Sequence, residues 1–432
     1  MLTGIIAAIT CAAMIGLVFF KPNIKIGKVI LSTYWLAPLT GAIIMLILGL
    51  VSPQQAIAGL TADNDVNPLK ILVLFISMTL ISIFLDNTGF FGYLAMAALK
   101  RSGKNQKSLM LMLYATVSVL TVFTSNDIIV LTFTPFICYF SKNAKIDPIP
   151  YLFCEFVAAN TWSMSLVIGN PTNIYLAGFA GIDFMQYVKV MLLPTIASGL
   201  VSMGVLFLLF SKKLSQPISH GEYLEVKLDK PLMLMGLISL FVCIVMMTVS
   251  SYIDIPMWII SLVCFLALYA AAFAYLVLNQ RPFTPIITSL KRTPYEIVPF
   301  IISMFIIVLS LQAAGLTDGI NRLLSSANNV FSYGAASFLS ANLVNNIPMS
   351  VLFSSVIEPL SGAARLQALF ASIAGSNIGA FLTPVGALAG IMWMGMLRSQ
   401  GIKLTFGQFS KYGAAVAFPS MLTVLACLRF IL

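Results

Sequence analysis

The chain has 432 residues, of which 59% are hydrophobic and 9% are charged, and its formal net charge is +10. An ordinary soluble domain carries about 25% charged residues. This composition therefore excludes a soluble globular protein and predicts a membrane protein with many spanning segments.

The positive charge is explained by membrane topology, because Lys and Arg gather in short loops, where they orient the helices. No nucleic-acid partner is expected. The six cysteines lie in apolar stretches without a CxxC pair, which indicates core residues and no disulfide framework. The single histidine, His220, and the lack of a GxxxxGK[ST] loop argue against a zinc protease and an ATP-driven motor.

Apolar stretches long enough to cross ~30 Å of hydrocarbon recur along the chain. About ten spans are expected, at residues 2–20, 30–51, 68–85, 150–178, 188–211, 231–251, 257–278, 297–311, 366–397 and 413–431. The first stretch lacks a basic leader and an Ala-x-Ala cleavage site, so we expect it to be retained.

Basic loops alternate along the chain with loops that are poor in cations. The cation-poor loops contain acidic residues instead: Asp63, Asp65, Asp183 and Asp254. The positive-inside rule then predicts that both termini lie on the non-cytoplasmic side of the cell's inner membrane.

Residues 108–140 are long enough to cross the membrane, yet both of their flanks are basic and should be cytoplasmic. A re-entrant helical hairpin that turns at residues 124–127 resolves the conflict. A carboxylate at the bilayer centre costs ~3 kcal/mol on insertion scales, and irregular backbone at that depth needs protein or a water-filled cavity around it. We therefore expect Ser125, Asn126 and Asp127 to face a cavity.

Residues 333–360 predict a second re-entrant hairpin from the opposite side, with its tip at Asn345 and Asn346. Ordered identities then connect the two halves of the chain: Ile76-Ser77-Met78 with Ile302-Ser303-Met304, Gly89 with Gly315, Asn126 with Asn345, Asn160 with Asn377, and Gly169 with Gly386. The loop charges give the halves opposite orientations. An inverted repeat is typical of secondary transporters, whose site lies near the midplane.

A long apolar run with helix breakers follows each hairpin. Residues 150–178 contain Gly169-Asn170-Pro171-Thr172-Asn173, and residues 366–397 contain Thr383, Pro384 and Gly386. Gly relaxes the backbone and Pro removes an N–H, so each run should divide into two half-helices whose ends expose N–H and carbonyl groups. A plain proline kink is the simpler alternative, but it does not explain two matched pairs of polar interruptions.

The sequence thus predicts an all-α polytopic membrane protein with an inverted repeat, two hairpins and two broken helices. It divides into N-terminal scaffold helices at 1–67, a first repeat at 68–211, scaffold helices and cytoplasmic loops at 212–296, and a second repeat at 297–432.

The segments "TSNDIIVLTFTPF", "VAANTWSMSLVIGNPTN", "SANLVNNIPMSVLF" and "GAFLTPVGALAG" resemble the arsenite permease family of the ion transporter superfamily, over roughly residues 70 to 430. The resemblance implies a secondary transporter, not an enzyme, with a scaffold and a transport part that moves like an elevator. The sodium-coupled dicarboxylate branch carries Ser-Asn-Thr at both tips, whereas the first tip here reads Ser125-Asn126-Asp127, as in arsenite permeases and sodium/proton antiporters.

The resemblance implies proton-coupled export of arsenite or antimonite as the neutral trihydroxide. The alternatives are Na+- or H+-coupled transport of a di- or tricarboxylate or an inorganic anion, and a channel, which an enclosed site disfavours. The candidate binding residues are Ser125, Asn126, Asp127, Gly169, Asn170, Thr172, Asn173, Asn345, Asn346, Thr383 and Gly386. No cofactor is expected beyond H+ or Na+, and a homodimer and a soluble ATPase subunit remain open as partners.

Asp127 suits proton coupling, and together with Asn126 it is a candidate Na+ site; the alternative is a helix cap. Asn160 and Asn377 are secondary candidates that interhelical hydrogen bonds would also explain. Glu155 is expected to be an interfacial or paired acid. Cys138 and Cys154 are expected in the core, because a carrier that chelated arsenic tightly would not release it.

Overall fold

A computed structural model of the protein describes residues 2–21, 23–26, 29–61, 67–101, 105–215, 218, 225–326 and 329–432. The expected residues Asp63, Asp65 and His220 lie outside these ranges. Within them the chain is helical, apart from a short antiparallel pair of strands, β1 (Asn23–Ile26) and β2 (Val29–Ser32). The predicted helical membrane fold is confirmed, with this β-hairpin as an addition.

Seven helical segments in the described part are long and apolar enough to cross a membrane. Ten stretches were expected, and the difference has a structural reason. Four expected spans are not among the seven. The two broken runs each divide into shorter helices, the stretch at 30–51 becomes helical only from Leu36, and the first stretch counts only as a shorter apolar helix over Leu2–Leu17. Conversely, one of the seven, Gln106–Phe123, is the first arm of the expected hairpin.

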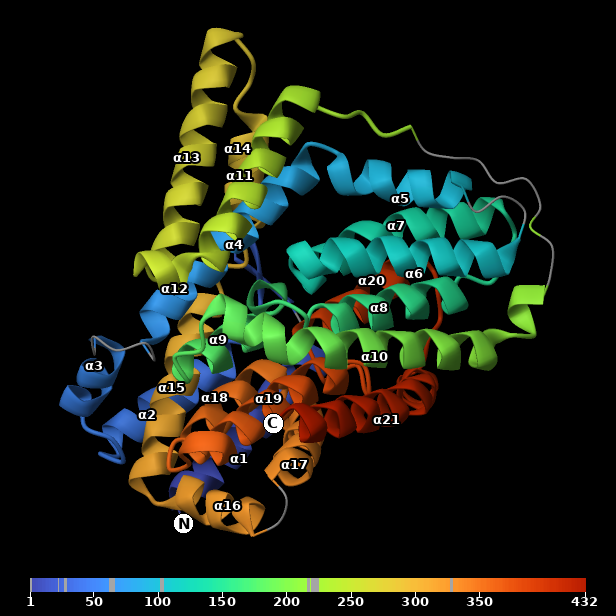
Figure 1. The fold of residues 1–432 in the computed structure, drawn as a ribbon. Coiled ribbons are helices and arrows are strands. Elements are labelled where there is room, and N and C mark those ends of the chain that lie inside the picture. Colours follow the sequence, from blue (N-terminus) through green and yellow to red (C-terminus); the bar gives the residue numbers. More distant parts are fainter. Residues whose placement is uncertain are drawn as a thin grey trace.

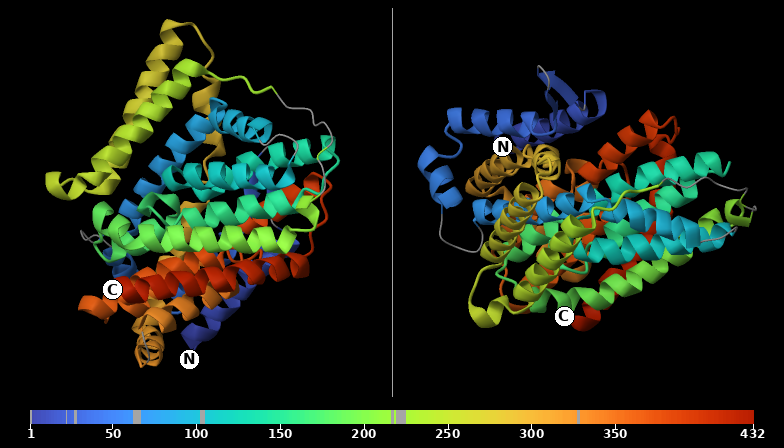
Figure 2. Two further views of the ribbon diagram at one scale, coloured as in Figure 1. Left: turned by 45° about the vertical axis from the view of Figure 1, so that its right-hand side comes forward. Right: turned by 90° about the horizontal axis from the view of Figure 1, so that it is seen from above.

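The N-terminal helices form one edge of the molecule (Figure 2). They are α1 (Leu2–Phe20), α2 (Leu36–Ile47) and α3 (Pro53–Thr61). Helix α2 packs between α1 and α15, so this edge is attached to the second half of the chain.

Two series of seven helices follow each other in the same order. The first comprises α4 (Pro68–Asn87), α5 (Phe90–Arg101), α6 (Gln106–Phe123), α7 (Asn126–Asn143), α8 (Ile149–Trp162), α9 (Pro171–Phe179) and α10 (Phe184–Phe210), with a 3-10 turn η1 (Val167–Gly169) between α8 and α9. The second comprises α15 (Ile297–Ala313), α16 (Leu316–Ser325), α17 (Asn329–Val344), α18 (Asn346–Ile357), α19 (Gly362–Gly379), α20 (Leu388–Ser399) and α21 (Phe406–Ile431).

The contacts between the two series are reciprocal. Helix α7 packs on α20, while α18 packs on α9, and the last helices α10 and α21 lie side by side (Figure 1). Gly89 and Gly315, which were matched in the sequence, both have positive φ (84° and 69°) at the ends of α4 and α15. Such crosswise contacts are what a two-fold relation between inverted repeats produces.

The chain between the repeats forms a separate pair of long helices. Its elements are the 3-10 turn η2 (Lys213–Ser215), α11 (Lys230–Thr248), α12 (Ser250–Ile253), α13 (Met257–Leu278) and α14 (Thr284–Arg292). Helices α11 and α13 pack against each other and α4, and stand away from the bundle formed by α6, α8 and α10 (Figure 1). Arg292 of α14 donates to Asp86 Oδ2 over 2.6 Å and ties α14 to the end of α4.

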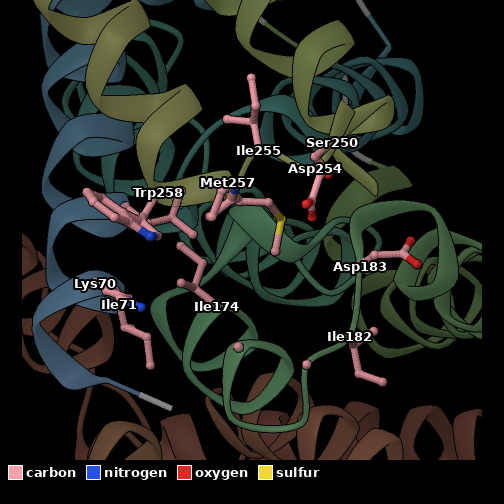
Figure 3. A pocket seen from close by; sticks show the side chains of 14 residues that line it. Lys70, Ile71, Ile174, Ile182, Asp183, Ser250, Asp254, Ile255, Met257 and Trp258 are labelled. Atoms are coloured by element: carbon pink, nitrogen blue, oxygen red, sulfur yellow. The ribbon is translucent and has the colours of Figure 1, made fainter. Parts of the chain in front are cut away.

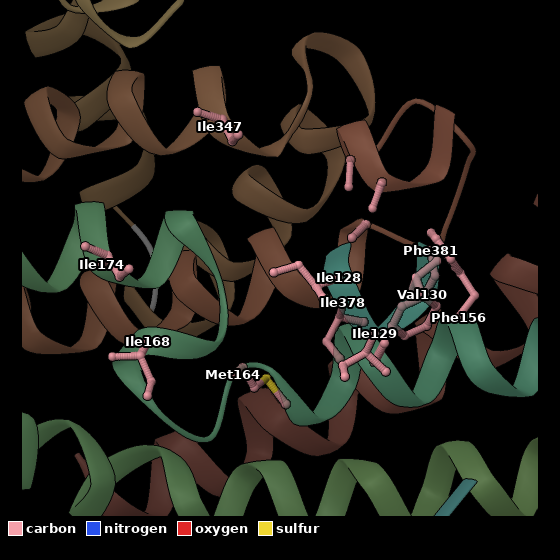
Figure 4. Packing of buried hydrophobic residues seen from close by; sticks show 14 of the residues in the cluster. Ile128, Ile129, Val130, Phe156, Met164, Ile168, Ile174, Ile347, Ile378 and Phe381 are labelled. Atoms are coloured by element: carbon pink, nitrogen blue, oxygen red, sulfur yellow. The ribbon is translucent and has the colours of Figure 1, made fainter. Parts of the chain in front are cut away.

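The two hairpins pack tightly against the broken helices that follow them. Helix α7 packs on α8, and α17 packs on α19. Ile128 and Ile129 of α7 also lie beside Ile378 of α19, in the second repeat (Figure 4). Where α17 crosses α19, a Cβ on Gly375 would lie 2.7 Å from the backbone nitrogen of Phe338. Only a glycine leaves room for this close approach.

Gly375→Ala is expected to destabilise the protein by about 1–3 kcal/mol, because the new methyl group overpacks a fixed backbone contact. The measurement is the thermal unfolding temperature of the purified protein in detergent. Gly395→Ala is the control, since nothing lies within 4 Å of a Cβ there. Equal effects at the two positions would contradict the tight crossing of α17 and α19.

Candidate functional site

Irregular backbone interrupts the helices at four places. The hairpin tips lie at Thr124-Ser125, between α6 and α7, and at Asn345, between α17 and α18. The helix breaks lie at residues 163–170 and 380–387. Both predicted hairpins and both predicted breaks are therefore present at the expected positions.

The structure changes one of the residue matches between the two repeats, that of Asn126 with Asn345. Ser125 is the N-cap of α7 and Asn345 is the N-cap of α18, so Asn126 corresponds to Asn346 and not to Asn345. The earlier pairing was wrong because an identity between two asparagines does not show where the helix begins. As a consequence, the second repeat has the apolar residue Ile347 in the place of Asp127.

Asn160 and Asn377, which were matched in the sequence, make the same local hydrogen bond. Asn160 Nδ2 donates to the carbonyl of Phe156, four residues earlier, over 2.8 Å. Asn377 Nδ2 donates to the carbonyl of Ile373, also four residues earlier, over 2.9 Å. Both side chains are fully buried.

Asn377 also connects the two repeats. Its Nδ2 donates to Asn173 Oδ1 over 2.7 Å, and its Oδ1 accepts from Ser163 Oγ over 2.9 Å and from Asn170 Nδ2 over 3.1 Å. All four side chains are buried. This cluster, which we call the Asn377 cluster, joins the second broken helix to both sides of the break in the first.

The residues of the Asn377 cluster also satisfy the backbone of the first break. Asn170 caps α9, because its Oδ1 accepts from the N–H and the hydroxyl of Thr172 over 3.1 and 3.0 Å. Asn173 Nδ2 donates to the carbonyl of Ser163 over 2.8 Å. A Cβ on Gly169 would lie 2.2 Å from that same carbonyl, so a side chain there would close the break.

The second break is held by Asn342, a residue that the sequence analysis missed. Asn342 Nδ2 donates to the carbonyl of Gly379 over 3.1 Å, while its Oδ1 accepts from the backbone N–H and the hydroxyl of Thr383 over 3.1 and 2.7 Å. The signal was present in "SANLVNN", where Asn342 is a third amide in an apolar run. Only the packing of α17 on α19 shows that it reaches the break.

The tip of the second hairpin is bonded to the same break. Asn345 Nδ2 donates to the carbonyl of Val385 over 2.9 Å, and the backbone N–H of Asn346 donates to the carbonyl of Gly386 over 3.1 Å. Asn345 has φ 76° and ψ 153°, a region that is occupied essentially by glycine alone and costs about 1–3 kcal/mol. The hydrogen bond to Val385 holds this strained conformation.

The first hairpin tip is bonded less completely. Asn126 Nδ2 donates to Asn160 Oδ1 over 3.0 Å, but its own Oδ1 is buried and has no partner among the described residues. The hydroxyls of Thr161 and Ser376, which are neighbours in sequence of Asn160 and Asn377, are also buried and unpartnered there. Each such group costs about 1–3 kcal/mol unless a ligand or water satisfies it.

Asp127 lies in the first turn of α7 and is partly exposed. Its carboxylate makes no hydrogen bond or ion pair within the part of the chain that the structure describes, and it is not the cap, because Ser125 is the N-cap residue. The helix dipole favours a carboxylate in this first turn. Tyr34, just before α2, interacts electrostatically with Asp127.

Two cavities lie near α4 and α9, and the smaller one reaches the first tip at Ser125. The larger has a volume of about 260 Å³ and opens between α4, α9 and the start of α13, with Lys70, Asp183 and Asp254 among its lining residues (Figure 3). The smaller, of about 10 Å³, is lined by Ser125, by Pro171 and by α4. Ile174 lines both cavities and therefore lies between them.

The described residues contain no group of three or more His, Cys, Asp or Glu side chains that could hold a metal ion. A Na+ site at Asn126 and Asp127 stays a prediction, since no structural observation tests it. Cys138 and Cys154 are buried free thiols, in line with their expected core positions.

Glu155, expected to be an interfacial or paired acid, is completely buried in the middle of α8. Its neighbour is the hydroxyl of Thr134 on α7, and no cation pairs with it among the described residues. The sequence placed it near the start of a span and could not show that α7 covers it.

Comparison with known proteins agrees with this architecture. Residues 17–375 match the citrate transporter family, CitMHS. The arsenical pump membrane protein of Escherichia coli is 26% identical over 373 residues, which cover 82% of this chain and 84% of that protein. The protein of the same name from Yersinia enterocolitica is 25% identical over 374 residues, with the same coverage.

The fold resembles that of the YdaH transporter of Alcanivorax borkumensis, whose crystal structure is described as having an unusual topology. The TM-score is 0.55 at 14% sequence identity, and the match covers 99% of this chain and 97% of that chain. These relatives confirm the resemblance that the hairpin and break motifs predicted. Because the family match spans most of its length, this chain is a secondary transporter that belongs to the citrate transporter (CitMHS) family.

Proposed function

We propose that the protein exports arsenite or antimonite across the inner membrane in exchange for protons, with both termini on the non-cytoplasmic side. The observation that carries this proposal is the chemistry of the four interruptions. Buried polar atoms without a partner among the described residues lie at the first tip, on Asn126, and in the last turns of the helices that lead into the two breaks, on Thr161 and Ser376, and the acid next to Asn126 is Asp127.

A neutral trihydroxide suits such a site. Its three hydroxyl groups donate and accept hydrogen bonds, and it needs no counter-charge in a desolvated site. The buried Oδ1 of Asn126 is an acceptor, and the hydroxyls of Thr161 and Ser376 offer both a donor and lone pairs. Filling these positions would remove the cost of leaving buried polar groups unpaired.

Asp127 is the residue we assign to proton coupling, because its carboxylate adjoins Asn126 and has no protein counter-ion among the described residues. A proton on Asp127 removes a charge from the tip, and loss of the proton restores it. If Asp127 binds its proton when the substrate has left and releases it when the substrate binds, the protein exchanges protons for substrate. A Na+ ion held by Asn126 and Asp127 is the alternative coupling ion.

The site moves between the two faces, in our proposal, by an elevator-like shift of both hairpins and both broken helices. The scaffold comprises residues 1–67 and 212–296 together with α4 and α15, which begin the repeats at 68–211 and 297–432. A polar contact crosses this boundary where Thr132 of α7 donates to Asp86 Oδ1 of α4 over 2.9 Å. That bond would break as the transport part moves.

The second candidate is cation-coupled transport of a di- or tricarboxylate, and it is favoured by the family to which the chain belongs. A citrate trianion near Asp127 would place like charges together in a desolvated site, where repulsion is far stronger than in water. This candidate therefore requires bound cations, whereas the neutral trihydroxide requires none.

Purified protein in liposomes is expected to move arsenite against its gradient when a pH difference is imposed, because proton exchange supplies the free energy. The measurement is radiolabelled or mass-spectrometric arsenite inside the vesicles. Flux that depends instead on sodium and on citrate or sulfate would favour the second candidate, and conduction without coupling would indicate a channel.

Asp127→Asn is expected to abolish coupled flux while expression and folding are retained, because asparagine keeps the size of the side chain but cannot release a proton. The assay is pH-driven arsenite transport. Asp147→Asn, which removes a carboxylate paired with Lys213 on the surface, serves as the control. Unchanged transport in Asp127→Asn would exclude Asp127 from coupling.

Asn377→Ala is expected to weaken arsenite binding by about 5- to 150-fold, since the buried partners Ser163, Asn170 and Asn173 lose a contact worth about 1–3 kcal/mol. Binding is measured by calorimetry on the purified protein. Asn279→Ala is the matched control, because Asn279 makes the same bond to a carbonyl four residues earlier at an exposed site. Equal losses in both variants would contradict a specific role.

A further inference from the structure

Glu155 is a fully buried acid that the proposed mechanism does not use. It lies in the middle of α8, which packs against α6, α7, α10 and α19. An isolated buried carboxylate costs several kcal/mol unless it is paired or takes up a proton. The contacts of Glu155 distinguish these two cases.

The carbonyl of Val130 and the carboxyl group of Glu155 both lie within hydrogen-bond distance of the Thr134 hydroxyl, which has one proton to donate. Thr134 Oγ1 lies 2.7 Å from the carbonyl of Val130, and 3.2 and 3.1 Å from the two carboxyl oxygens of Glu155. The Thr134 hydroxyl carries a single proton, which it can donate either to the carbonyl of Val130 or to a carboxyl oxygen of Glu155. At most this one hydroxyl donor therefore compensates the fully buried carboxyl group, and no cation pairs with it among the described residues, so ionised Glu155 would be poorly stabilised.

The charges around Glu155 agree with a neutral acid. No cation pairs with Glu155 among the described residues, and the ionisable residues nearest to it along α7 and α8 are the buried free thiols of Cys138 and Cys154. The buried ionisable side chains of α6 and α10 are Tyr114 and Tyr187, whose hydroxyls donate to backbone carbonyls. The buried part of α19, residues 368–379, has no charged side chain.

The second repeat shows that the fold does not need an acid here. When the repeats are aligned so that Asn160 matches Asn377, Ser372 corresponds to Glu155. When they are aligned at the hairpin tips, Ser354 corresponds to Thr134. Both serines are buried and donate to carbonyls of their own helices. A hydroxyl group is therefore sufficient for packing at this position, and the presence of a carboxyl group in the first repeat needs another explanation.

We propose that Glu155 is a proton-binding site, distinct from Asp127, which holds its proton in this conformation and releases it during the transport cycle. The proposal rests on the proton coupling of the proposed function, although not on arsenite as the substrate. Glu155 is linked to the first tip through α8, because Asn160 on the same helix binds Asn126. Loss of its proton would place a charge inside the transport part.

The first test is direct and needs no substrate. Infrared spectra of the purified protein are expected to show the C=O stretch of a protonated carboxyl group, and Glu155→Gln should remove it. Glu358→Gln, at an exposed position on α18, should leave it unchanged. A spectrum that is the same in the wild type and Glu155→Gln would overturn the proposal, whatever the substrate proves to be.

The second test concerns proton release and uses whichever of arsenite or citrate the wild-type protein carries in liposomes. Glu155→Gln is expected to exchange about one proton fewer per substrate and to lose the corresponding pH dependence of the transport rate. An unchanged proton-to-substrate ratio and pH profile, despite loss of the infrared band, would reduce Glu155 to a structural acid and overturn proton release.

Glu155→Ser, which copies the residue of the second repeat, is the reserve variant for both measurements. Both variants should fold, because each places a neutral side chain at a site that holds a neutral carboxyl group in this conformation. Failure of both variants to fold would overturn the proposal, since such a site should accept a neutral side chain.

Discussion

The architecture depends on the satisfaction of backbone groups where helices are broken inside the membrane. Unwound residues leave N–H and carbonyl groups that lipid cannot satisfy. Asn377 and its partners supply these hydrogen bonds from side chains and, at the same time, connect the two repeats. This cluster thus stabilises the first break and joins the two halves, while Asn342 bonds the second break.

The two repeats use the same scaffold for different chemistry. In the second repeat, Asn342 and Asn345 bond the hairpin tip to the neighbouring break. In the first repeat, the tip retains an unpartnered amide oxygen on Asn126 and an acid at Asp127, and a second acid, Glu155, lies deeper in the same half. The two buried or half-buried acids near the interruptions therefore lie in the first repeat, whereas amide side chains bond the second tip to its break.

This division has a physical consequence for transport. At the second tip, a hydrogen bond to Val385 holds the strained backbone of Asn345. The first tip instead has an unpartnered amide oxygen on Asn126 and an acid at Asp127. In the proton-coupled cycle that we propose, only the first half would change its charge, so that a pseudo-symmetric fold could serve an asymmetric cycle.

Local chemistry, by itself, determined the membrane class, the two hairpins and the two breaks, because apolar length, loop charge and Gly-Pro interruptions act within a few residues of chain. The match of Asn160 with Asn377 was also readable in the sequence. The tertiary structure alone decided that Asn126 corresponds to Asn346, that Asn342 holds the second break, and that Glu155 is buried under Thr134. These properties depend on side chains brought together from segments that lie up to 214 residues apart, as Ser163 and Asn377 do, and no local pattern encodes such contacts.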